Sequence, residues 1–264
     1  MSTKHNVLNS IDQESYKIKS WILDQIITYK KKYNIENNSD LRILDWGCGR
    51  GRAVFTLLQD GFEAYGTDID RSALKNGSEL FKKNGYKPEH HLLIVEATSQ
   101  WEPESFDIII SDQVFEHIKD LDELIIQQNR LLKKNGISVH VFPSSKIVIE
   151  PHIKVPLVHW LPKNKARKAA IILFCLLSSK INKINWPETE GKSLWEKADI
   201  YYKYLNEKTY YRDNEKIKST FNDNGFKASY FIKGAGKGKR KFIPAYFSRN
   251  GFPDQQARFI ATKI

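Results

Sequence analysis

The sequence predicts an α/β fold in which a mostly parallel sheet of seven strands carries helices on both faces and an inserted, mainly helical lid after the fifth strand. Short apolar runs alternate with amphipathic helical patterns from residue 41 to residue 143, as in consecutive βαβ units. A glycine-rich turn follows the first of these runs. The alternation breaks at Pro143 and returns near residue 213, which marks the stretch between as an insertion.

The composition indicates a folded, basic chain. With 264 residues, of which 41% are apolar, the chain can bury a substantial core and is not intrinsically disordered. Its two cysteines, Cys48 and Cys175, cannot form a disulfide framework or a cysteine-rich zinc site, and we expect no bound metal. Residues 1–10 carry no secretory signal, and the uncharged stretch 169–179 is too short to span a bilayer. These features favour a cytoplasmic protein.

The elements follow from these patterns in chain order. A Ser10-x-x-Gln13 capping box precedes a helical pattern over 11–33, which the polar run 34–40 ends. The strands of the core are expected at 42–44, 64–67, 92–95, 105–110 and 137–142. The helices between them are expected at 53–58, 72–84 and 121–134. A helix over 213–224 and two strands at 227–232 and 258–264 are expected to complete the edge of the sheet.

The chain is therefore expected to have four parts. They are an N-terminal helical cap (1–40), the core (41–143), the inserted lid (144–213), and a C-terminal helix with a strand pair (214–264). Charge is distributed unevenly among them: residues 1–143 carry 18 basic and 21 acidic side chains, whereas residues 144–264 carry 24 and 10. Any basic surface thus belongs to the C-terminal half.

The glycine-rich turn is the first sign of a ligand site. Residues 45–51 read D-W-G-C-G-R-G and open into a helix, so that glycines stand at 47, 49 and 51. Glycines in this spacing let the backbone turn sharply and approach a ligand, and the helix behind them is expected to offer free amide donors. A dinucleotide fingerprint would need its third glycine at Arg52. Asp45, placed ahead of the glycines, favours a ligand with positive charge instead.

Carboxylates follow the next strands as well. Asp68 ends the second strand, where an acid can accept two hydrogen bonds from a ribose diol. Glu96 closes the third strand and can accept a hydrogen bond from an adenine amine. The fourth strand then leads into Asp112 and a Glu116-His117 pair. Because the carboxyl ends of parallel strands meet at one edge of a sheet, these acids are expected to surround a single ligand.

Together, these motifs resemble the core of the class I S-adenosylmethionine-dependent methyltransferases, in the variant with a Glu-His element after the fourth strand. The resemblance covers residues 41–143 and implies a Rossmann-like fold, S-adenosylmethionine as cofactor and methyl transfer as the activity. Carboxylates suit this cofactor because it bears a sulfonium and an ammonium group. The cofactor contacts that the resemblance implies are Asp45, Gly47, Cys48, Gly49, Gly51, Asp68, Ile69, Glu96, Ala97, Asp112 and Gln113.

Methyl transfer requires that the acceptor be aligned with the methyl group and, for a hydroxyl acceptor, that a base remove the hydroxyl proton. His117 is the candidate base because it follows the fourth strand and titrates near neutral pH, and Glu116 is expected to orient it or the substrate hydroxyl. The alternative is that His117 caps the following helix or packs locally. His140, inside a strand, is interpreted as a core histidine. His152 and His159 lie in the insertion, where they could face an acceptor.

The insertion is expected to select the acceptor, since additions around this sheet edge differ while the cofactor half is shared. We interpret the activity as O-methylation of a small or glycan-type acceptor, such as a nucleotide- or lipid-linked surface-polysaccharide sugar. The apolar helix expected over 169–180 is flanked by basic residues, which suits peripheral contact with the anionic inner face of the membrane. The alternative is burial of this helix against the sheet or at a dimer interface.

Two other functions remain open. A methyltransferase of lipids or quinone precursors would share the cofactor half and use the apolar insertion as a tunnel. A nucleic-acid-binding protein on a methyltransferase scaffold would explain the basic C-terminal half, but no nucleic-acid-binding module is recognisable, so a nucleic-acid partner is disfavoured. The basic loop 233–241 could instead bind phosphates of an activated sugar. The sequence does not indicate an oligomeric state.

Overall fold

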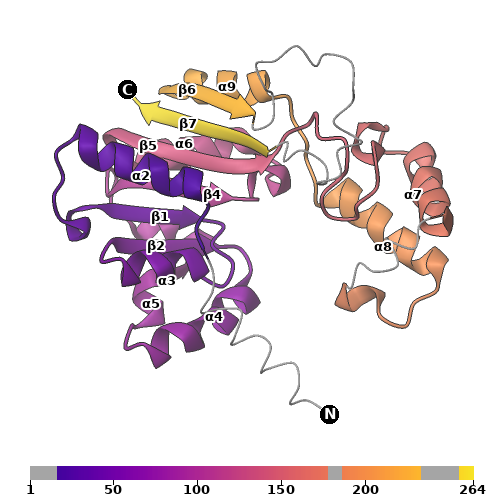
Figure 1. The fold of residues 1–264 in the computed structure, drawn as a ribbon, viewed down its shortest axis with the longest axis horizontal. Coiled ribbons are helices and arrows are strands. Elements are labelled where there is room, and N and C mark those ends of the chain that lie inside the picture. The colour runs from indigo at the N-terminus through magenta and orange to yellow at the C-terminus, as the bar shows by residue number, and fades with distance from the viewer. Residues whose placement is uncertain (1–16, 178–185, 233–255) are drawn as a thin grey trace.

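The computed structural model describes residues 17–177, 186–232 and 256–264. Its centre is a seven-stranded sheet in the order β3-β2-β1-β4-β5-β7-β6 (Figure 1). The strands are β1 (Arg42–Trp46), β2 (Glu63–Asp68), β3 (Leu92–Ile94), β4 (Phe106–Asp112), β5 (Leu132–Pro143), β6 (Phe226–Ile232) and β7 (Gln256–Lys263). Strands β1 to β5 run parallel, while β7 is antiparallel to both β5 and β6. The predicted mostly parallel sheet is thus confirmed.

Helices cover both faces because successive side chains of each strand point to opposite sides. On one face, Ile43 and Ile108 join a core with α2 (Ser20–Lys32), α3 (Arg52–Gln59) and α4 (Arg71–Lys83). On the other face, Leu44 and Ile109 pack with α6 (Leu121–Leu131) and α9 (Asn214–Asp223). A short helix α5 (Pro88–His91) leads into β3.

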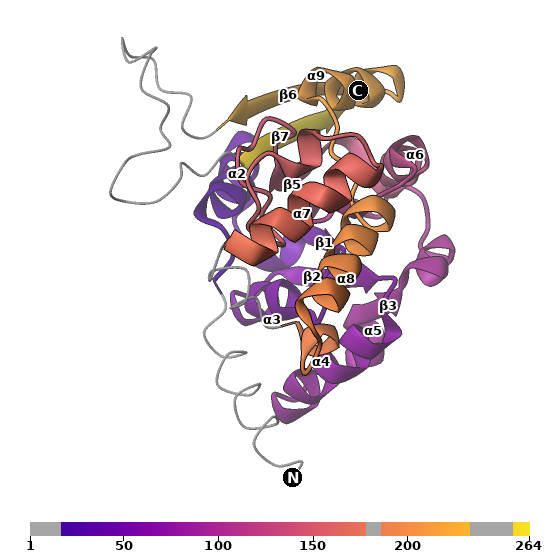
Figure 2. The same ribbon diagram turned by 90° about the vertical axis from the view of Figure 1, so that its right-hand side faces the viewer.

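The insertion forms a helical unit with a hydrophobic core of its own. Helix α7 (Lys165–Leu177) packs against α8 (Leu194–Glu207) beyond the end of the sheet toward which β1 and β5 point, as Figures 1 and 2 show. Ile171 and Cys175 from α7 meet Tyr201 and Leu205 from α8 in this core. The expected burial of the apolar helix against the sheet was therefore wrong. Its buried face belongs to the insertion itself.

Some boundaries differ from the sequence-based expectation. Helix α8 was not predicted, although Ser193 and Glu196 form a complete capping box at its start. Helix α6 ends at Leu131 and β5 begins directly after it. Within the described residues, no helix is long and apolar enough to cross a membrane. The predicted capping box at Ser10, the end of the 169–180 helix and the basic loop 233–241 lie outside the described residues.

Candidate active site

The glycine turn between β1 and α3 takes the conformation that its spacing predicts. Gly47, Gly49 and Gly51 all have positive φ angles, of 79°, 55° and 71°. A side chain at Gly47 would also collide with Val114, so no other residue fits there. Around Gly49, in contrast, a Cβ would meet nothing within 4 Å. The turn is thus packed on one side and open on the other.

The turn's amides, however, are not free. Those of Gly47 and Cys48 donate to the Thr67 carbonyl oxygen at 2.7 and 3.0 Å, and that of Gly49 donates to Asp68 Oδ2 at 2.7 Å. The free donors expected from the sequence belong to the start of the following helix, whereas the turn uses its own amides to fix itself to β2. Recognition of a ligand by this turn therefore falls more on side chains.

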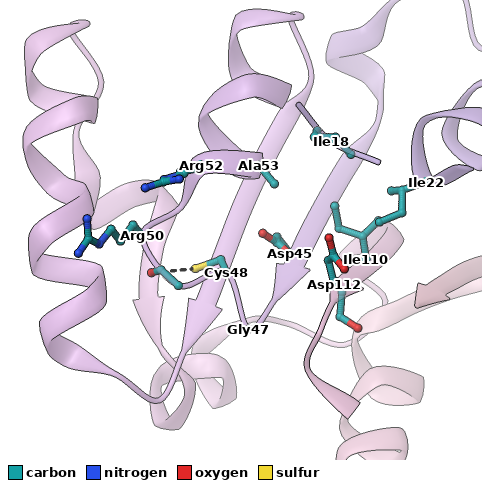
Figure 3. A pocket seen from close by; sticks show the side chains of 12 residues that line it. Ile18, Ile22, Asp45, Gly47, Cys48, Arg50, Arg52, Ala53, Ile110 and Asp112 are labelled. Atoms are coloured by element: carbon teal, nitrogen blue, oxygen red, sulfur yellow. Dashed lines mark hydrogen bonds between the residues drawn. The ribbon is translucent and has the colours of Figure 1, made fainter. Parts of the chain in front are cut away.

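A cavity of about 280 Å³ lies in front of the turn. Its lining comes from the turn, the start of α3, the end of β4 and the first residues of the N-terminal segment. The lining residues are Ile18, Ile22, Asp45, Gly47, Cys48, Gly49, Arg50, Arg52, Ala53, Ile110, Ser111 and Asp112. Figure 3 shows Asp45 and Asp112 close together at the ends of β1 and β4, with Arg50 and Arg52 on the other side of the turn. Acidic groups therefore line one side of the cavity and basic groups border the other.

Three carboxylates stand close together on the acidic side of this cavity. Burial, together with the nearby Asp112 and Asp68 carboxylates, raises the pKa of Asp45 to about 8. Among the described residues, no hydrogen bond reaches the Asp45 side chain. A cation placed between Asp45 and Asp112 would relieve both the repulsion and the desolvation.

Lys19 supplies one cation at this position, and no sequence pattern pointed to it. Its Nζ lies 2.5 Å from Asp112 Oδ1 and donates to Gln256 Oε1 at 3.0 Å. The residue stands just before α2 and far in sequence from both partners. Only the folded chain, which lays the N-terminal segment beside β4 and β7, brings this ammonium group to the acid.

The other predicted cofactor contacts lie outside the cavity lining. Asp68 ends β2 beside the turn, where its Oδ1 also accepts a hydrogen bond from the Asp70 amide at 2.9 Å. Ile69 is exposed, as is Glu96, which stands with Ala97 in a 3-10 helix (Val95–Gln100) after β3. Gly51 stands in sequence between the lining residues Arg50 and Arg52, and Gln113 follows the lining residue Asp112. The cavity is slightly smaller than ordinary ligand pockets of about 300–1,000 Å³, so a nucleoside would extend from it over the ends of β2 and β3.

Glu116 and His117 form a second polar centre after β4. Glu116 is only 2% exposed, and neither of its carboxylate oxygens has a hydrogen-bond partner among the residues that the structure describes. Burial raises its pKa to about 7. His117 Nδ1 donates to the Lys208 carbonyl oxygen at 2.6 Å, which leaves Nε2 as the unprotonated nitrogen of the neutral ring. The alternative that His117 caps the following helix was wrong: Asp120 accepts from the Glu123 amide and caps α6.

The insertion brings His152 against this centre. The rings of His117 and His152 are 5.0 Å apart, centroid to centroid, and His152 Nδ1 lies 2.5 Å from Glu150 Oε1. Glu150 is fully buried, and burial alone would raise its pKa, but hydrogen bonds from His152, Tyr211 and the Ile153 amide lower it below the usual value. Sequence reasoning identified His152 but missed Glu150 and Tyr211, for which no motif exists.

The remaining histidines behave as packing residues or lie apart. His140 is fully buried between Ser111 and Ser138, both within hydrogen-bond distance of its ring, and burial lowers its pKa to about 3. Its interpretation as a core histidine is confirmed. His159 is buried against Tyr211, at 4.8 Å between ring centroids, and neither ring nitrogen has a hydrogen-bond partner among the described residues.

Comparisons with known proteins agree with this arrangement. A family model described as a methyltransferase domain matches residues 37–209. Two curated relatives are ubiquinone biosynthesis O-methyltransferases, from Rickettsia prowazekii (27% identical over 147 residues, covering 53% of this chain and 56% of the relative) and Pelagibacter ubique (30% over 98 residues, 37% and 40%). The chain thus spans about half the length of the curated relatives it matches.

Solved structures share the fold at low sequence identity. A S-adenosylmethionine-dependent methyltransferase from Methanosarcina mazei is 16% identical, with a TM-score of 0.52, over 88% of this chain and 96% of the other. The phosphoethanolamine N-methyltransferase 2 of Haemonchus contortus, solved with S-adenosylmethionine bound, is 16% identical, with a TM-score of 0.53, over 91% and 52%. At this identity the likeness concerns the architecture alone.

Proposed function

Because this chain belongs to the methyltransferase-domain family, as a class I S-adenosylmethionine-dependent enzyme, we propose that it methylates an oxygen of a small-molecule acceptor. The observation that carries the proposal is the position of the Glu116–His117 centre, which follows the same strand end as Asp112 of the cavity. A cofactor site and a proton-accepting site thus adjoin each other. The names of the curated relatives, which are O-methyltransferases, support the same chemistry.

The residues present suit the cofactor. When bound, S-adenosylmethionine supplies a methyl group on a positively charged sulfur. The cavity offers Asp45 and Asp112 to positive groups, and Arg50 and Arg52 border it on the side that suits a carboxylate. We assign the amino-acid end of the cofactor to this cavity, with Gly47, Cys48, Gly49 and Gly51 as its close backbone wall.

The nucleoside end is assigned to the open strand ends beside the cavity. Asp68 retains lone pairs for the ribose hydroxyls even while it accepts from two amides. Glu96 and Ala97, in the 3-10 helix after β3, are assigned to the adenine, and exposed Ile69 is assigned to cover its ring. Gln113 is assigned to the methyl-donor end next to Asp112. A titration calorimetry series with alanine variants tests these assignments residue by residue.

Methyl transfer to oxygen also requires removal of a proton. For its oxygen to accept the methyl group from the sulfur, an acceptor hydroxyl bound here would have to give up its proton to a base or to water. His117 Nε2 is the unprotonated nitrogen of a ring held by the Lys208 carbonyl. Beside it, the Glu116 carboxylate has no hydrogen-bond partner in the described ranges. Both groups suit the role of proton acceptor that the sequence assigned to them.

The acceptor class is proposed from the relatives and the insertion. The names of the curated relatives favour a quinone precursor, and the sequence pattern favours a glycan-type hydroxyl on a nucleotide- or lipid-linked sugar. Purified protein with isotopically labelled cofactor, offered both acceptor classes, separates them. Label transfer to oxygen of either class supports the proposal. Cofactor binding with transfer only to nitrogen or carbon acceptors would contradict it.

We also propose that α7 brings the enzyme to an anionic membrane surface from the cytoplasmic side. Leu173, Leu176 and Leu177 are exposed on α7, with Lys165 and Lys168 near its start. Sedimentation with anionic lipid vesicles is expected to retain the wild type and to lose the Leu176→Glu variant. The matched control is Ile126→Glu, an exposed apolar residue on α6. Equal retention of the wild type and Leu176→Glu would contradict membrane contact through α7.

The nucleic-acid alternative has its own test. It predicts retention on DNA or RNA that falls steeply as salt is raised. Methyl transfer that is unaffected by competitor nucleic acid, together with no retention at physiological salt, would remove this alternative.

A further inference from the structure

We propose that Glu116, His117 and His152 bind one divalent transition-metal ion of the zinc type at the boundary between the core and the insertion. One ligand atom from each of these side chains lies within 4.8 Å of the other two. Two imidazoles and one carboxylate are a common ligand set for Zn²⁺ and for Fe²⁺ or Co²⁺. This inference builds on the proposed function, because it places the ion on the acceptor side.

The hydrogen bonds behind both histidines have the arrangement of a metal site. His117 Nδ1 donates to the Lys208 carbonyl oxygen, and His152 Nδ1 pairs with the buried Glu150 carboxylate. Metal-binding histidines almost always anchor their second nitrogen in this way, which fixes the ring and leaves Nε2 for the ion. Among the described residues, Nε2 of neither ring has a hydrogen-bond partner.

Glu116 provides the independent observation. It is 2% exposed, and both of its oxygens are buried without a hydrogen-bond partner in the described structure. A buried carboxylate in this state costs free energy unless a cation or a donor meets it. Glu150, the other buried carboxylate beside His152, accepts four hydrogen bonds. The contrast singles out Glu116 as the group that lacks its partner.

The size of the cluster fits one ion after a small closure. Ligand atoms bound at about 2.0–2.2 Å from a tetrahedral zinc ion lie about 3.3–3.6 Å apart. Side-chain rotations that move the ligand atoms together by up to about 1.5 Å therefore complete the site. Three protein ligands leave at least one coordination position open, which is the pattern of catalytic rather than structural zinc sites.

An open position beside the cofactor cavity has a chemical use. An acceptor hydroxyl bound there would lose its proton to water more easily, since a zinc ion lowers the pKa of bound water from 15.7 to about 7. The acceptor oxygen then attacks the methyl carbon as the carbon–sulfur bond breaks. With the ion in place, Glu116 and His117 act as its ligands and the ion replaces them in activating the hydroxyl. The sequence-based expectation of no metal considered cysteines, whereas these ligands come from distant segments.

Co²⁺ provides a direct probe of the site. Tag-free protein, stripped with a chelator, is titrated with Co²⁺ and followed by its visible absorption, and with Zn²⁺ by calorimetry. We expect one ion per chain, and at least tenfold weaker binding in His152→Ala and Glu116→Gln. The matched control is His90→Ala, an exposed histidine on α5, which should bind as the wild type does. Titration of each variant with S-adenosylmethionine checks that it is folded.

The outcomes separate this proposal from the proposed function. A protein that binds the cofactor but gives no Co²⁺ band, or a His152→Ala variant that binds Zn²⁺ as tightly as the wild type, overturns the metal site. A protein that binds Co²⁺ at this site but transfers no methyl group to any oxygen supports the metal site and contradicts the proposed function.

Discussion

The cofactor side and the acceptor side of this molecule are built in different ways. The cofactor cavity lies at strand ends of the core, and its acids follow strands whose order the sheet dictates. The acceptor side joins a segment after β4 to an insertion that has a separate hydrophobic core. Charge is balanced differently as well. Lys19 pairs with Asp112 on the cofactor side, while the Glu116 carboxylate on the acceptor side has no hydrogen-bond partner within the described part of the chain. The cofactor site is thus formed by the strand order of the sheet, and the acceptor site by contact between the core and the insertion.

Because the two sides are built separately, we expect substitutions on the acceptor side to lower the turnover number without changing the affinity for the cofactor. His117→Ala is expected to lower the turnover number by about 10² or more, because the acceptor loses either its base or a ligand of its activating ion. Cofactor affinity from calorimetry should stay within about twofold of the wild type. Near-normal turnover would show that His117 has no part in the reaction.

A substitution at the end of β2 is expected instead to weaken binding of the cofactor. Asp68→Ala is expected to weaken cofactor binding by about 10- to 100-fold, since two hydrogen bonds to a charged acceptor are worth roughly 1.5–3 kcal/mol. Asp60→Ala, which removes an exposed acid after α3, serves as the control. Unchanged affinity in Asp68→Ala would overturn the ribose assignment.

The acids of the cavity predict a pH dependence. Because the pKa of Asp45 is raised to about 8, this group is protonated in the free protein below that pH, while a bound cation favours its ionised form. Cofactor affinity should therefore rise with pH, by up to about tenfold per unit, and level off above pH 8. Calorimetry between pH 6 and 9 on the wild type and Asp45→Asn measures this. A wild-type slope equal to that of the variant would contradict it.

The same shift affects stability. The raised folded-state pKa means that the free protein binds one more proton than the unfolded chain between about pH 4 and 8, so its stability falls as pH rises through that window. In Asp45→Asn the side chain does not titrate, so this fall in stability with rising pH is absent. The melting temperature of the variant should thus increase relative to the wild type as pH is raised from 5 to 8. A constant difference would contradict the assignment.

The smallest expected effect concerns the insertion. Ser193→Ala removes the N-cap of α8 and should cost about 0.5–2 kcal/mol of local stability. Hydrogen exchange is expected to increase in α7 and α8 and not in the core, since the two units have separate hydrophobic clusters. Ser219→Ala, an exposed serine in α9, is the control. Equal acceleration throughout the chain would show that the two units unfold together.

The sequence predicted the parts that depend on local signals. The glycine turn, the strands of the core and the helix before β6 follow from spacing and periodicity, and the structure confirms them. Lys19, Glu150 and Tyr211 could not be found in this way, because their partners lie far away along the chain. Helix α8 carried a recognisable capping box, but the many aromatic and proline residues around it obscured the pattern. The roles assigned to Asp68, Glu96 and His117 stay predictions.

The place of β7 in the sheet has a consequence for how the chain assembles. Strand β6 precedes β7 in sequence, yet its only neighbour in the sheet order is β7, which pairs in turn with β5 at His140 and Phe259. Pairing of β5 with β7 therefore joins segments that are separated in sequence by the insertion, α9 and β6. Closing so long a loop has an entropic cost, which slows this step of folding.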